Sequence, residues 1–482
     1  MKIKNLILLI PIIFLGQSFE SNLPIISINT HGNDILDDPR IIADMGIINN
    51  LNKINKLSDD FNNYNGKISI EIRGSSSQDL FPKKSYSIET QTIEGDNNNV
   101  SLIQLPEEND WVLYGAYSDK TLFRNNLAYE LSRQMGYYSP RTKHCELFIN
   151  NEYQGVYILT EKIKRDKNRV NIKKIDENDS SGGYIIKIDK LTDAPIDASW
   201  CSNFTTLNNN LVCFQYHYPK ADDITMNQKN YIENFMNSIY NSIKDLSDKQ
   251  SSIDLINNIN FDSFIDYMII NELSKNVDAY RISTFLFKDS DEINGRLNMG
   301  PVWDYNLSFG NVDFCKSSEI NGWVFDEESS CNGSVPSYWI DLLKNDSFRN
   351  RLTGRWFELR NSVLSFENIF THIDSVSQHL SSAQIRNFER WNILDDYIWP
   401  NYQLAESYED EIGFLKYWIY HRANWIDENI NDIRLIFPDC SSEEKKLLNT
   451  VNILGEKSEY RNNKIFFNIY DNGCVEKNYI TY

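Results

Sequence analysis

Basic charge is scarce in this sequence. Its 482 residues hold 48 Lys and Arg against 68 Asp and Glu, which gives a net charge of -20. Such a chain repels phosphate backbones and anionic lipid, so nucleic acid is not an expected partner. The 41% hydrophobic and 13% aromatic content predicts a large folded core. The length allows one big domain with appendages or about two to three ordinary domains.

Long apolar runs are also scarce, since the sequence has one, from Leu6 to Leu15. It follows two lysines and precedes small or polar residues at 16–18, which is the pattern of a signal peptide. The alternative is a membrane anchor, but the run is shorter than the ~20 residues that span a bilayer. We therefore predict a signal peptide over residues 1–19 and an exported chain, extracellular or on the outer cell surface. No integral membrane span is expected after cleavage.

Zinc-site spacing is absent, because there is no CxxC motif and the six histidines are scattered. This argues against a structural metal cluster. The seven cysteines instead fit an exported protein with disulfides. Cys145, in the strand-like CELFI, is expected to be a small buried hydrophobe. Two cysteine pairs each bracket a polar excursion and predict local disulfides, and a third pair is possible: Cys201 with Cys213, Cys315 with Cys331, and Cys440 with Cys474.

The first half of the chain carries strand patterns. Residues 22–64 are weakly patterned and indicate an entry strand and loops. KISIEIRG (67–74) alternates isoleucine with polar residues, SYSIET follows it, and CELFINNEYQGVYILTEKI indicates two strands around a polar turn. Between them a helix is predicted, with Asp119 as its N-cap and Gly136 as its stop. Together these segments predict an antiparallel sheet carrying one helix.

The second half carries helix patterns. FDSFIDYMIINELSK (261–275) indicates a mainly apolar helix, and aromatic-rich helical stretches dominate residues 336–432. The predicted fold class is therefore α+β, with a sheet-rich N-lobe, a helix-rich C-lobe and a small all-β C-terminal tail. The expected boundaries are 20–436 for the main domain and 437–482 for the tail. A cleft between two such lobes is a favoured place for chemistry.

Two aspartates stand out in NVDAYRISTFLFKD (276–289) and GPVWDYNLSFGN (300–311). Asp278 follows the apolar helix at a helix-to-strand junction, where loops carry function on a rigid support, although it could be a turn or capping residue. Asp304 lies between Trp303 and Tyr305. A carboxylate in such apolar surroundings must be buried against a donor or bound to a cation.

Other candidates lie in the N-terminal half. Gly74 with the following serines offers backbone approach and hydroxyl donors, although such a turn is usually only a turn. Lys83 and Lys84 begin a strand, where a solvated lysine pair is the ordinary explanation. By strand parity, however, Lys84 shares the side of Tyr86 and Ile88 and would point inward, where an ammonium needs an anionic partner. Glu161 closes the strand VYILTE, either as its exposed end or as part of the cleft.

Several ordered motifs together resemble the spore coat protein H (CotH) family of atypical, protein-kinase-like proteins. The resemblance covers roughly residues 67–430 and rests on more than one motif. The motifs are Arg73-Gly74 with Ser75 and Ser76, Lys83-Lys84-Ser85-Tyr86, Arg124-Asn125-Asn126, GVYILTE, NVD and PVWDYN.

The resemblance implies a two-lobed kinase-like fold. It further implies transfer of phosphoryl from ATP, or another nucleotide bound to Mg²⁺ or Mn²⁺, to a hydroxyl of a protein substrate. Asp278 would orient the acceptor hydroxyl, and Asp304 with Asn306 would hold the metal. Lys84 would contact the phosphates and act with Asp278 in catalysis, with Lys83 as the alternative lysine. The implied nucleotide-binding residues are Arg73, Ser75, Ser76, Lys83, Lys84 and Glu161.

Two positions depart from the family pattern. Ser283 stands where kinases place a metal-binding asparagine, and Asn306 stands where the family often has a second aspartate. Both changes weaken Mg²⁺ binding or favour a single metal. An exported chain also meets little ATP. The alternative is thus a catalytically inactive cell-surface protein for assembly or adhesion. A carboxylate hydrolase built on Asp278 and Asp304 ranks last, because no paired-acid motif supports it.

The last forty or so residues carry a separate pattern. Strand-like runs lie around LLNTVNILG and KIFFNIYDNGCVEK. The stretch resembles the C-terminal sorting domain of type 9 secretion substrates, especially in VNILGE and IYDNGCVEK. The resemblance implies the secretion machinery as a partner and a surface-exposed or released bacterial protein. The alternative is a terminal hairpin that belongs to the main domain.

Overall fold

The chain forms two compact units in the computed structural model. Unit 1 comprises Met1–Gly115, Thr142–Thr160 and His379–Trp391, and unit 2 comprises Ala116–Arg141, Glu161–Gln378 and Asn392–Tyr482. The predicted signal peptide, apart from Phe19, and the possible pair Cys440 and Cys474 lie outside the described residues. The structure describes residues 19–176, 179–192, 196–245, 249–326, 331–433, 446–452, 457–458, 465–470 and 475–479.

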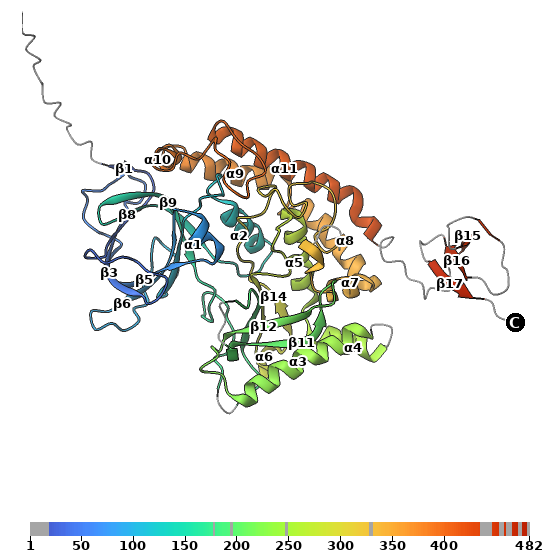
Figure 1. The fold of residues 1–482 in the computed structure, drawn as a ribbon. Helices are drawn as coiled ribbons and strands as arrows, with labels where there is room; N and C mark the ends of the chain where they lie inside the picture. The colour runs from blue at the N-terminus through green and yellow to red at the C-terminus, as the bar shows by residue number, and fades with distance from the viewer. Residues whose placement is uncertain are drawn as a thin grey trace, which may run out of the picture. The chain divides into compact units, whose positions relative to one another are not determined.

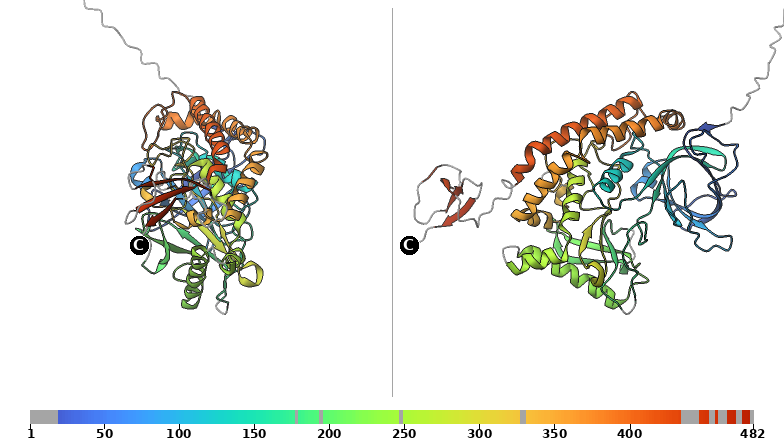
Figure 2. Two further views of the ribbon diagram at one scale, coloured as in Figure 1. Left: turned by 90° about the vertical axis from the view of Figure 1, so that its right-hand side faces the viewer. Right: turned by 180° about the vertical axis from the view of Figure 1, so that it is seen from behind.

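Unit 1 is built on a closed barrel whose strands follow the order β2-β3-β5-β6-β7-β9-β8. The ring can be followed in Figure 1 and in the right-hand view of Figure 2. Beside it, β1 (Glu20–Ser21) pairs with β4 (Asn55–Lys56). The short helix α1 (Ser76–Leu80) and the helix α10 (Ala383–Arg390) complete the unit. The barrel strands are β2 (Ile25–Asn29), β3 (Ile41–Ile48), β5 (Tyr64–Arg73), β6 (Ser85–Gln91), β7 (Asp110–Tyr114), β8 (Thr142–Ile149) and β9 (Glu152–Glu161).

The barrel core explains the strand patterns of the sequence. The predicted strands at 67–74 and 85–90 are confirmed, and Ile68, Ile70 and Ile88 are buried inside the barrel as the alternation requires. The weakly patterned stretch 22–64 holds two full barrel strands instead of one entry strand. The ring closes where β2 runs parallel to β8. The sheet is therefore closed and not purely antiparallel.

Gly155 allows α10 to pack against the barrel. Its φ is +102°, and an added Cβ would lie 2.7 Å from Asn387 Oδ1 and 3.1 Å from Trp391 Nε1. Asn387 Oδ1 in turn accepts a hydrogen bond from Val156 N at 3.1 Å. A side chain at position 155 would push this helix off strand β9.

Unit 2 contains a five-stranded sheet in the order β11-β12-β10-β13-β14, in which the paired strands are antiparallel. The helix-rich prediction for this half missed the sheet. Helix α3 packs beside β11, where the rings of Phe204 and Tyr240 meet edge to face at 5.1 Å (Figure 1). The strands are β10 (Tyr184–Ile188), β11 (Ser199–Thr205), β12 (Leu211–Tyr218), β13 (Thr284–Lys288) and β14 (Leu297–Met299).

The helices of unit 2 include those that the sequence predicted, among them α5 over FDSFIDYMIINELS. Helix α2 ends at Gln134, before Gly136 with its φ of +105°, so the predicted stop is confirmed. Its N-cap is Phe123, so the prediction of Asp119 was wrong, although Asp119 Oδ2 accepts the Arg124 N–H at 2.8 Å. The helices are α2 (Arg124–Gln134), α3 (Met226–Lys244), α4 (Lys249–Asn258), α5 (Phe261–Ser274), α6 (Asp291–Asn294), α7 (Tyr338–Leu343), α8 (Asp346–Arg360), α9 (Phe366–Leu380, its last two residues in unit 1) and α11 (Tyr408–Asn429).

Both local disulfides expected from the sequence are present. Cys201 and Cys213 face each other on β11 and β12, and Cys315 joins Cys331. Cys145 is a buried thiol.

The described residues of the C-terminal stretch form a three-stranded antiparallel sheet. Its strands are β15 (Leu447–Asn452), β16 (Ile465–Tyr470) and β17 (Val475–Tyr479). Within the parts of the chain that the structure describes, no helix is both long and apolar enough to cross a bilayer.

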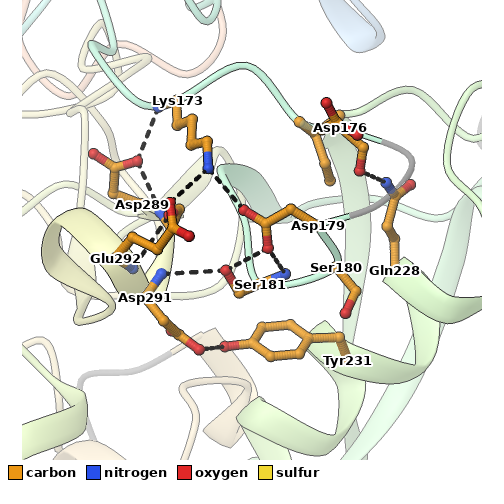
Figure 3. Close-up of polar contacts among 12 residues, drawn as sticks. Lys173, Asp176, Asp179, Ser180, Ser181, Gln228, Tyr231, Asp289, Asp291 and Glu292 are labelled. Carbon is orange, nitrogen blue, oxygen red and sulfur yellow. Dashed lines mark hydrogen bonds and ion pairs between the residues drawn. The ribbon is translucent and has the colours of Figure 1, made fainter.

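A polar network ties the loop before β10 to helix α6 (Figure 3). Lys173 Nζ lies 3.0 Å from both Asp179 Oδ2 and Glu292 Oε2, while the Lys173 N–H donates to Asp289 Oδ1 at 2.8 Å. The hydroxyl and the backbone N–H of Ser181 donate to Asp179 Oδ1. These two bonds, followed by that of Lys173, lower the pKa of Asp179 to about 2. These ion pairs and hydrogen bonds hold the loop before β10 in place.

Candidate functional site

Two loops of unit 2 lie side by side, one after α5 and the other after β14. Phe309 N donates to Ser274 O at 2.7 Å, and Val277 N donates to Leu307 O at 3.3 Å. These loops carry the two aspartates that the sequence singled out. Main-chain bonds between loops fix their spacing, so the two carboxylates stand on a common support.

Asn276 joins the two aspartates directly. Its Oδ1 accepts the Asp278 N–H at 3.2 Å, and its Nδ2 donates to Asp304 O at 3.3 Å. The side chain is buried. Because one amide serves both backbones, a shift of either loop is transmitted to the other. The structure thus links the backbones of Asp278 and Asp304 through one side chain.

Asp278 is held by one neighbour. Its Oδ1 accepts from Arg281 Nη2 at 2.7 Å, and Arg281 Nε donates to Val277 O at 3.1 Å. Among the described residues, Oδ2 of Asp278 accepts no hydrogen bond. Burial raises the pKa of Asp278, against the opposing charges of Arg281 and Lys190. A carboxylate with a raised pKa and an unused oxygen suits the acceptance of a proton.

Asp304 sits in a left-handed backbone conformation, which is uncommon for residues other than glycine. Its φ is +65°, and its N–H donates to Tyr129 Oη at 3.0 Å. Asn306 follows two residues later and accepts from Asn311 Nδ2 through its backbone oxygen at 2.8 Å. Left-handed backbone at residues other than glycine concentrates at functional sites. The conformation therefore supports a specific role for the loop.

The donor set fits a metal that is shared with a phosphate ligand. Mg²⁺ is usually held by one or two protein carboxylates, with phosphate and water oxygens completing its shell. Asp304 offers a carboxylate and Asn306 an amide oxygen. Within the described residues, no group of three or more His, Cys, Asp or Glu could hold a metal alone. These residues fit an ion that arrives with a nucleotide, and not a closed structural metal site.

A buried acid supports the loop that follows Asp278. Tyr280 has a φ of +69°, costly for a bulky residue, and its hydroxyl donates to Glu272 Oε1 at 2.8 Å. Glu272 also accepts the N–H groups of Val324 and Phe325 at 2.8 and 3.2 Å. Arg422 Nε donates to Glu272 O at 2.9 Å. Burial raises the pKa of Glu272 and lowers that of Arg422 to about 10.

Ser283 lies in the turn just before β13. Its φ is +50°, and its side chain is half-buried. Asparagine is several-fold enriched in this region of backbone space. The backbone of this turn would therefore accommodate asparagine, the residue of the kinase pattern, although the chain has serine.

The second set of predicted residues, apart from Glu161, lies in unit 1. Gly74 follows the strand β5 with a φ of +117°, and an added Cβ would collide with Ser77 Oγ. Only glycine permits this turn. Ser75 and Ser76 follow it and are exposed. Gln78 Nε2 donates to Gly74 O at 2.6 Å and closes the turn onto α1.

Lys84 reaches this serine turn. Its Nζ donates to Phe81 O at 2.8 Å and also to Gln78 O. An ammonium has three donors, so one N–H remains beyond these two bonds. Among the described residues, Lys84 makes no ion pair. The structure thus brings Lys84 to the segment that carries Ser75 and Ser76.

Lys83 has a different environment from its neighbour. It is buried, and its Nζ donates to Val156 O at 2.7 Å and to Asn387 Oδ1 at 2.8 Å. The ammonium also lies 5.1 Å from the ring centre of Tyr157. These contacts join β9, α10 and the start of β6, so Lys83 acts as a structural cross-link of unit 1.

Arg73 and Glu161 complete the predicted nucleotide set. Arg73 is the last residue of β5 and pairs with Ser85 of β6, beside the serine turn. Glu161 belongs to unit 2 and is fully buried. It accepts from Arg141 Nη1 at 2.6 Å, from Arg141 N at 2.9 Å and from Tyr138 Oη at 3.3 Å. Its carboxylate therefore binds the segment that precedes β8.

Of the predicted residues, those in unit 2 are thus Asp278, Asp304, Asn306 and Glu161, and those in unit 1 are Arg73, Ser75, Ser76, Lys83 and Lys84. Sequence reasoning missed Asn276, Arg281 and Tyr129, which position these groups. Arg281 could have been found from its spacing of three residues after Asp278. Tyr129 lies far away in the sequence, and no local pattern connects it with Asp304.

Comparison with known proteins gives one positive result. No curated protein matches the chain. The family described as CotH kinase protein matches residues 70–426, which is most of the chain and includes both sets of candidate residues. With its paired aspartate loops and its lysine beside a glycine and serine turn, the chain belongs to the CotH kinase protein family.

Proposed function

We propose that this protein is an exported, kinase-like enzyme that transfers phosphoryl from a metal-bound nucleotide to a hydroxyl of a protein. The observation that supports this most is the bridge made by Asn276, which bonds the backbones of Asp278 and Asp304, the residues that we assign to proton acceptance and to the metal. Phosphoryl transfer needs these two groups together with a cation on the phosphates.

Each residue has a role in the proposed reaction. Asp278 accepts the proton of the acceptor hydroxyl through Oδ2, while Arg281 holds Oδ1 in place. Lys84 donates its remaining N–H to a phosphate oxygen, and Arg73 with Ser75 and Ser76 adds further donors. Asp304 and Asn306 hold Mg²⁺ or Mn²⁺, which neutralises charge on the phosphates when bound. We assign Lys83 to stability, because its donors already serve Val156 and Asn387.

The test is transfer of labelled γ-phosphate from ATP by the full chain, with Mg²⁺ or Mn²⁺ present. Wild-type protein is expected to bind nucleotide and to transfer phosphate to itself or to an added protein. Asp304→Ala and Asp278→Ala should each lower transfer by about a thousandfold or more, the range seen when one catalytic group is lost. Asp395→Ala, which removes an exposed carboxylate of unit 2, should have no effect and serves as the matched control.

A second candidate function is an inactive surface protein on the same scaffold. Ser283 and Asn306 favour it, because both remove metal ligands that the family pattern supplies. If the wild-type protein is folded and binds no nucleotide with either metal, the result would support an inactive surface protein and contradict the kinase proposal. Pull-down from the surface fraction of the producing cell would then be used to find the partner.

Export and surface display are part of the proposal. The local disulfides Cys201–Cys213 and Cys315–Cys331 fit an oxidising compartment. Residues 1–19 would direct export, and residues 437–482 would be read by the type 9 secretion machinery. Removal of 437–482 should leave the protein inside the producing cell envelope, which fractionation would detect. Surface display without this segment would instead make it part of the main domain.

A further inference from the structure

Two side chains of helix α2 bind successive backbone groups of the Asp304 loop. The Asp304 N–H donates to Tyr129 Oη at 3.0 Å, and the Tyr305 N–H donates to Asn125 Oδ1 at 2.5 Å. Asn125 and Tyr129 are four residues apart, so they share one face of the helix. Together they form a clamp on the two peptide groups that flank Asp304.

The loop needs such a clamp because its backbone is strained. A residue other than glycine in left-handed backbone costs on the order of 1–3 kcal/mol and persists only where its surroundings enforce it. Asp304 has this conformation, with a φ of +65°. Its neighbours are also held, since Trp303 stacks on the Tyr129 ring at 6.1 Å and Tyr305 Oη donates to Asn271 Oδ1 at 2.8 Å.

Helix α2 is fixed within unit 2 and can serve as a rigid template. At its start, the fully buried Arg124 pairs with Asp119 at 2.7 Å and with Glu411 at 3.0 Å. Beyond its end, Arg355 Nη2 donates to Met135 O at 3.3 Å. A helix anchored at both ends keeps its side-chain acceptors in fixed positions, which is what preorganisation of a site requires.

We propose that Asn125 and Tyr129 are positioning residues that orient the Asp304 carboxylate for the metal-nucleotide complex. The inference rests on the proposed function. Neither residue needs to touch the metal or the substrate, since both act through the backbone of residues 304 and 305. Loss of either bond would let one of the two peptides that flank Asp304 rotate, and the carboxylate would leave the direction in which it binds the cation.

The first variant is Tyr129→Phe, which removes the acceptor oxygen and keeps the ring that stacks on Trp303. The matched control is Tyr408→Phe, because the buried Tyr408 hydroxyl also bonds one backbone group, Thr121 O, at 2.9 Å. The measurement is Mn²⁺ affinity of the full chain with a non-hydrolysable ATP analogue, followed by the Mn²⁺ magnetic resonance signal. Tyr129→Phe should weaken Mn²⁺ binding about threefold to tenfold, in line with one lost hydrogen bond, and the control should not.

The second series uses Asn125. Asn125→Asp keeps an acceptor oxygen for the Tyr305 N–H, whereas Asn125→Leu has similar size and no acceptor. Hydrogen exchange of the segment 300–311, measured without metal, should speed up in Asn125→Leu and Tyr129→Phe. It should stay near the wild-type rate in Asn125→Asp and Tyr408→Phe. A general loss of stability would speed exchange throughout unit 2, so the effect is expected in this segment alone.

The outcomes separate this inference from the proposed function. Wild-type protein that binds no Mn²⁺-nucleotide overturns the proposed function, and this inference with it. If wild-type protein binds Mn²⁺ with the nucleotide analogue, and Tyr129→Phe and Tyr408→Phe bind Mn²⁺ as tightly, only the positioning role is overturned. Weaker Mn²⁺ binding in Tyr129→Phe, with faster exchange confined to 300–311, supports it.

Discussion

At the scale of single residues, the neighbours Lys83 and Lys84 have separate tasks. The sequence offered both as phosphate lysines. The structure buries Lys83 against Val156 O and Asn387 Oδ1, whereas Lys84 lies half-buried beside the serine turn. The strand-parity prediction that Lys84 is the lysine that points inward was wrong, because Lys83 is the buried one and α10 supplies its partner from far along the chain. The local sequence pattern therefore could not predict the burial of Lys83.

We expect Lys83→Ala to lower the free energy of unfolding by about 2–3 kcal/mol, because it leaves buried acceptors without their donor. Lys84→Ala should change stability by less than about 0.5 kcal/mol, as substitutions away from the core usually do, and should weaken nucleotide binding at least about tenfold. Urea denaturation and nucleotide titration of both variants would check this. A stable Lys83→Ala protein that cannot bind nucleotide would reverse the two roles.

Ser283 offers a gain-of-function prediction. Asparagine suits its φ of +50° better than serine and adds an amide oxygen for a metal. Ser283→Asn should therefore lower the Mg²⁺ concentration that half-saturates nucleotide binding, by about threefold to tenfold for one added ligand interaction. Nucleotide titrations at several Mg²⁺ concentrations would measure this. Ser283→Ala is the control, and equal behaviour of the two variants would exclude position 283 as a metal ligand.

At the scale of elements, local patterns were reliable where one face of a segment is buried. Alternation located β5 and β6, and the apolar run located α5, because burial of these faces forces the pattern. The strand β10 was missed, since it pairs with β12 and β13 and not with a strand next to it in sequence. Barrel closure was missed for the same reason. The parallel pairing of Ile25 with Glu146 leaves no local signal.

Strand β12 gives a pH-dependent prediction. His217 Nε2 lies 2.9 Å from Ile163 O, to which it donates when protonated there, and its ring meets Phe285 edge to face. Burial lowers the pKa of His217 to about 4 from its ordinary 6.5. Between pH 4 and pH 6.5, His217 is protonated in the unfolded chain and neutral in the folded chain. Stability should therefore fall as pH drops from 6.5 to 4, by up to about 3 kcal/mol from this residue.

The measurement is urea denaturation of wild type and His217→Gln across this pH range. Glutamine keeps an N–H donor for Ile163 O and has no titration of its own. Buried carboxyl groups with raised pKa values, such as Asp278 and Glu272, act in the opposite direction. Subtracting the unfolding free energy of His217→Gln from that of wild type at each pH cancels the contribution of these carboxyl groups. Parallel pH curves for the two proteins would mean that His217 does not titrate as described.

At the scale of the whole molecule, the two units differ in their covalent support. Both disulfides lie in unit 2. Among the described residues of unit 1 there is one cysteine, Cys145, and it is a buried thiol. The disulfides close loops with sequence separations of 12 and 16 residues. A disulfide that closes a loop of this size should add about 3 kcal/mol to the free energy of unfolding, because it restricts the unfolded chain. The contribution belongs to unit 2, because loop closure acts on the part of the chain that unfolds with the loop.

Reduction should therefore act on one unit. With a reducing agent, or in a variant with all four cysteines changed to serine, hydrogen exchange should speed up in β11, β12 and the segment 315–326. Exchange in the barrel strands β5 and β6 should stay near its wild-type rate, because a compact unit with its own core opens by its own free energy. Mass spectrometry of exchanged peptides separates these regions. Equal loss of protection in the barrel would show that the two units unfold as one, and the disulfides would then support the whole chain.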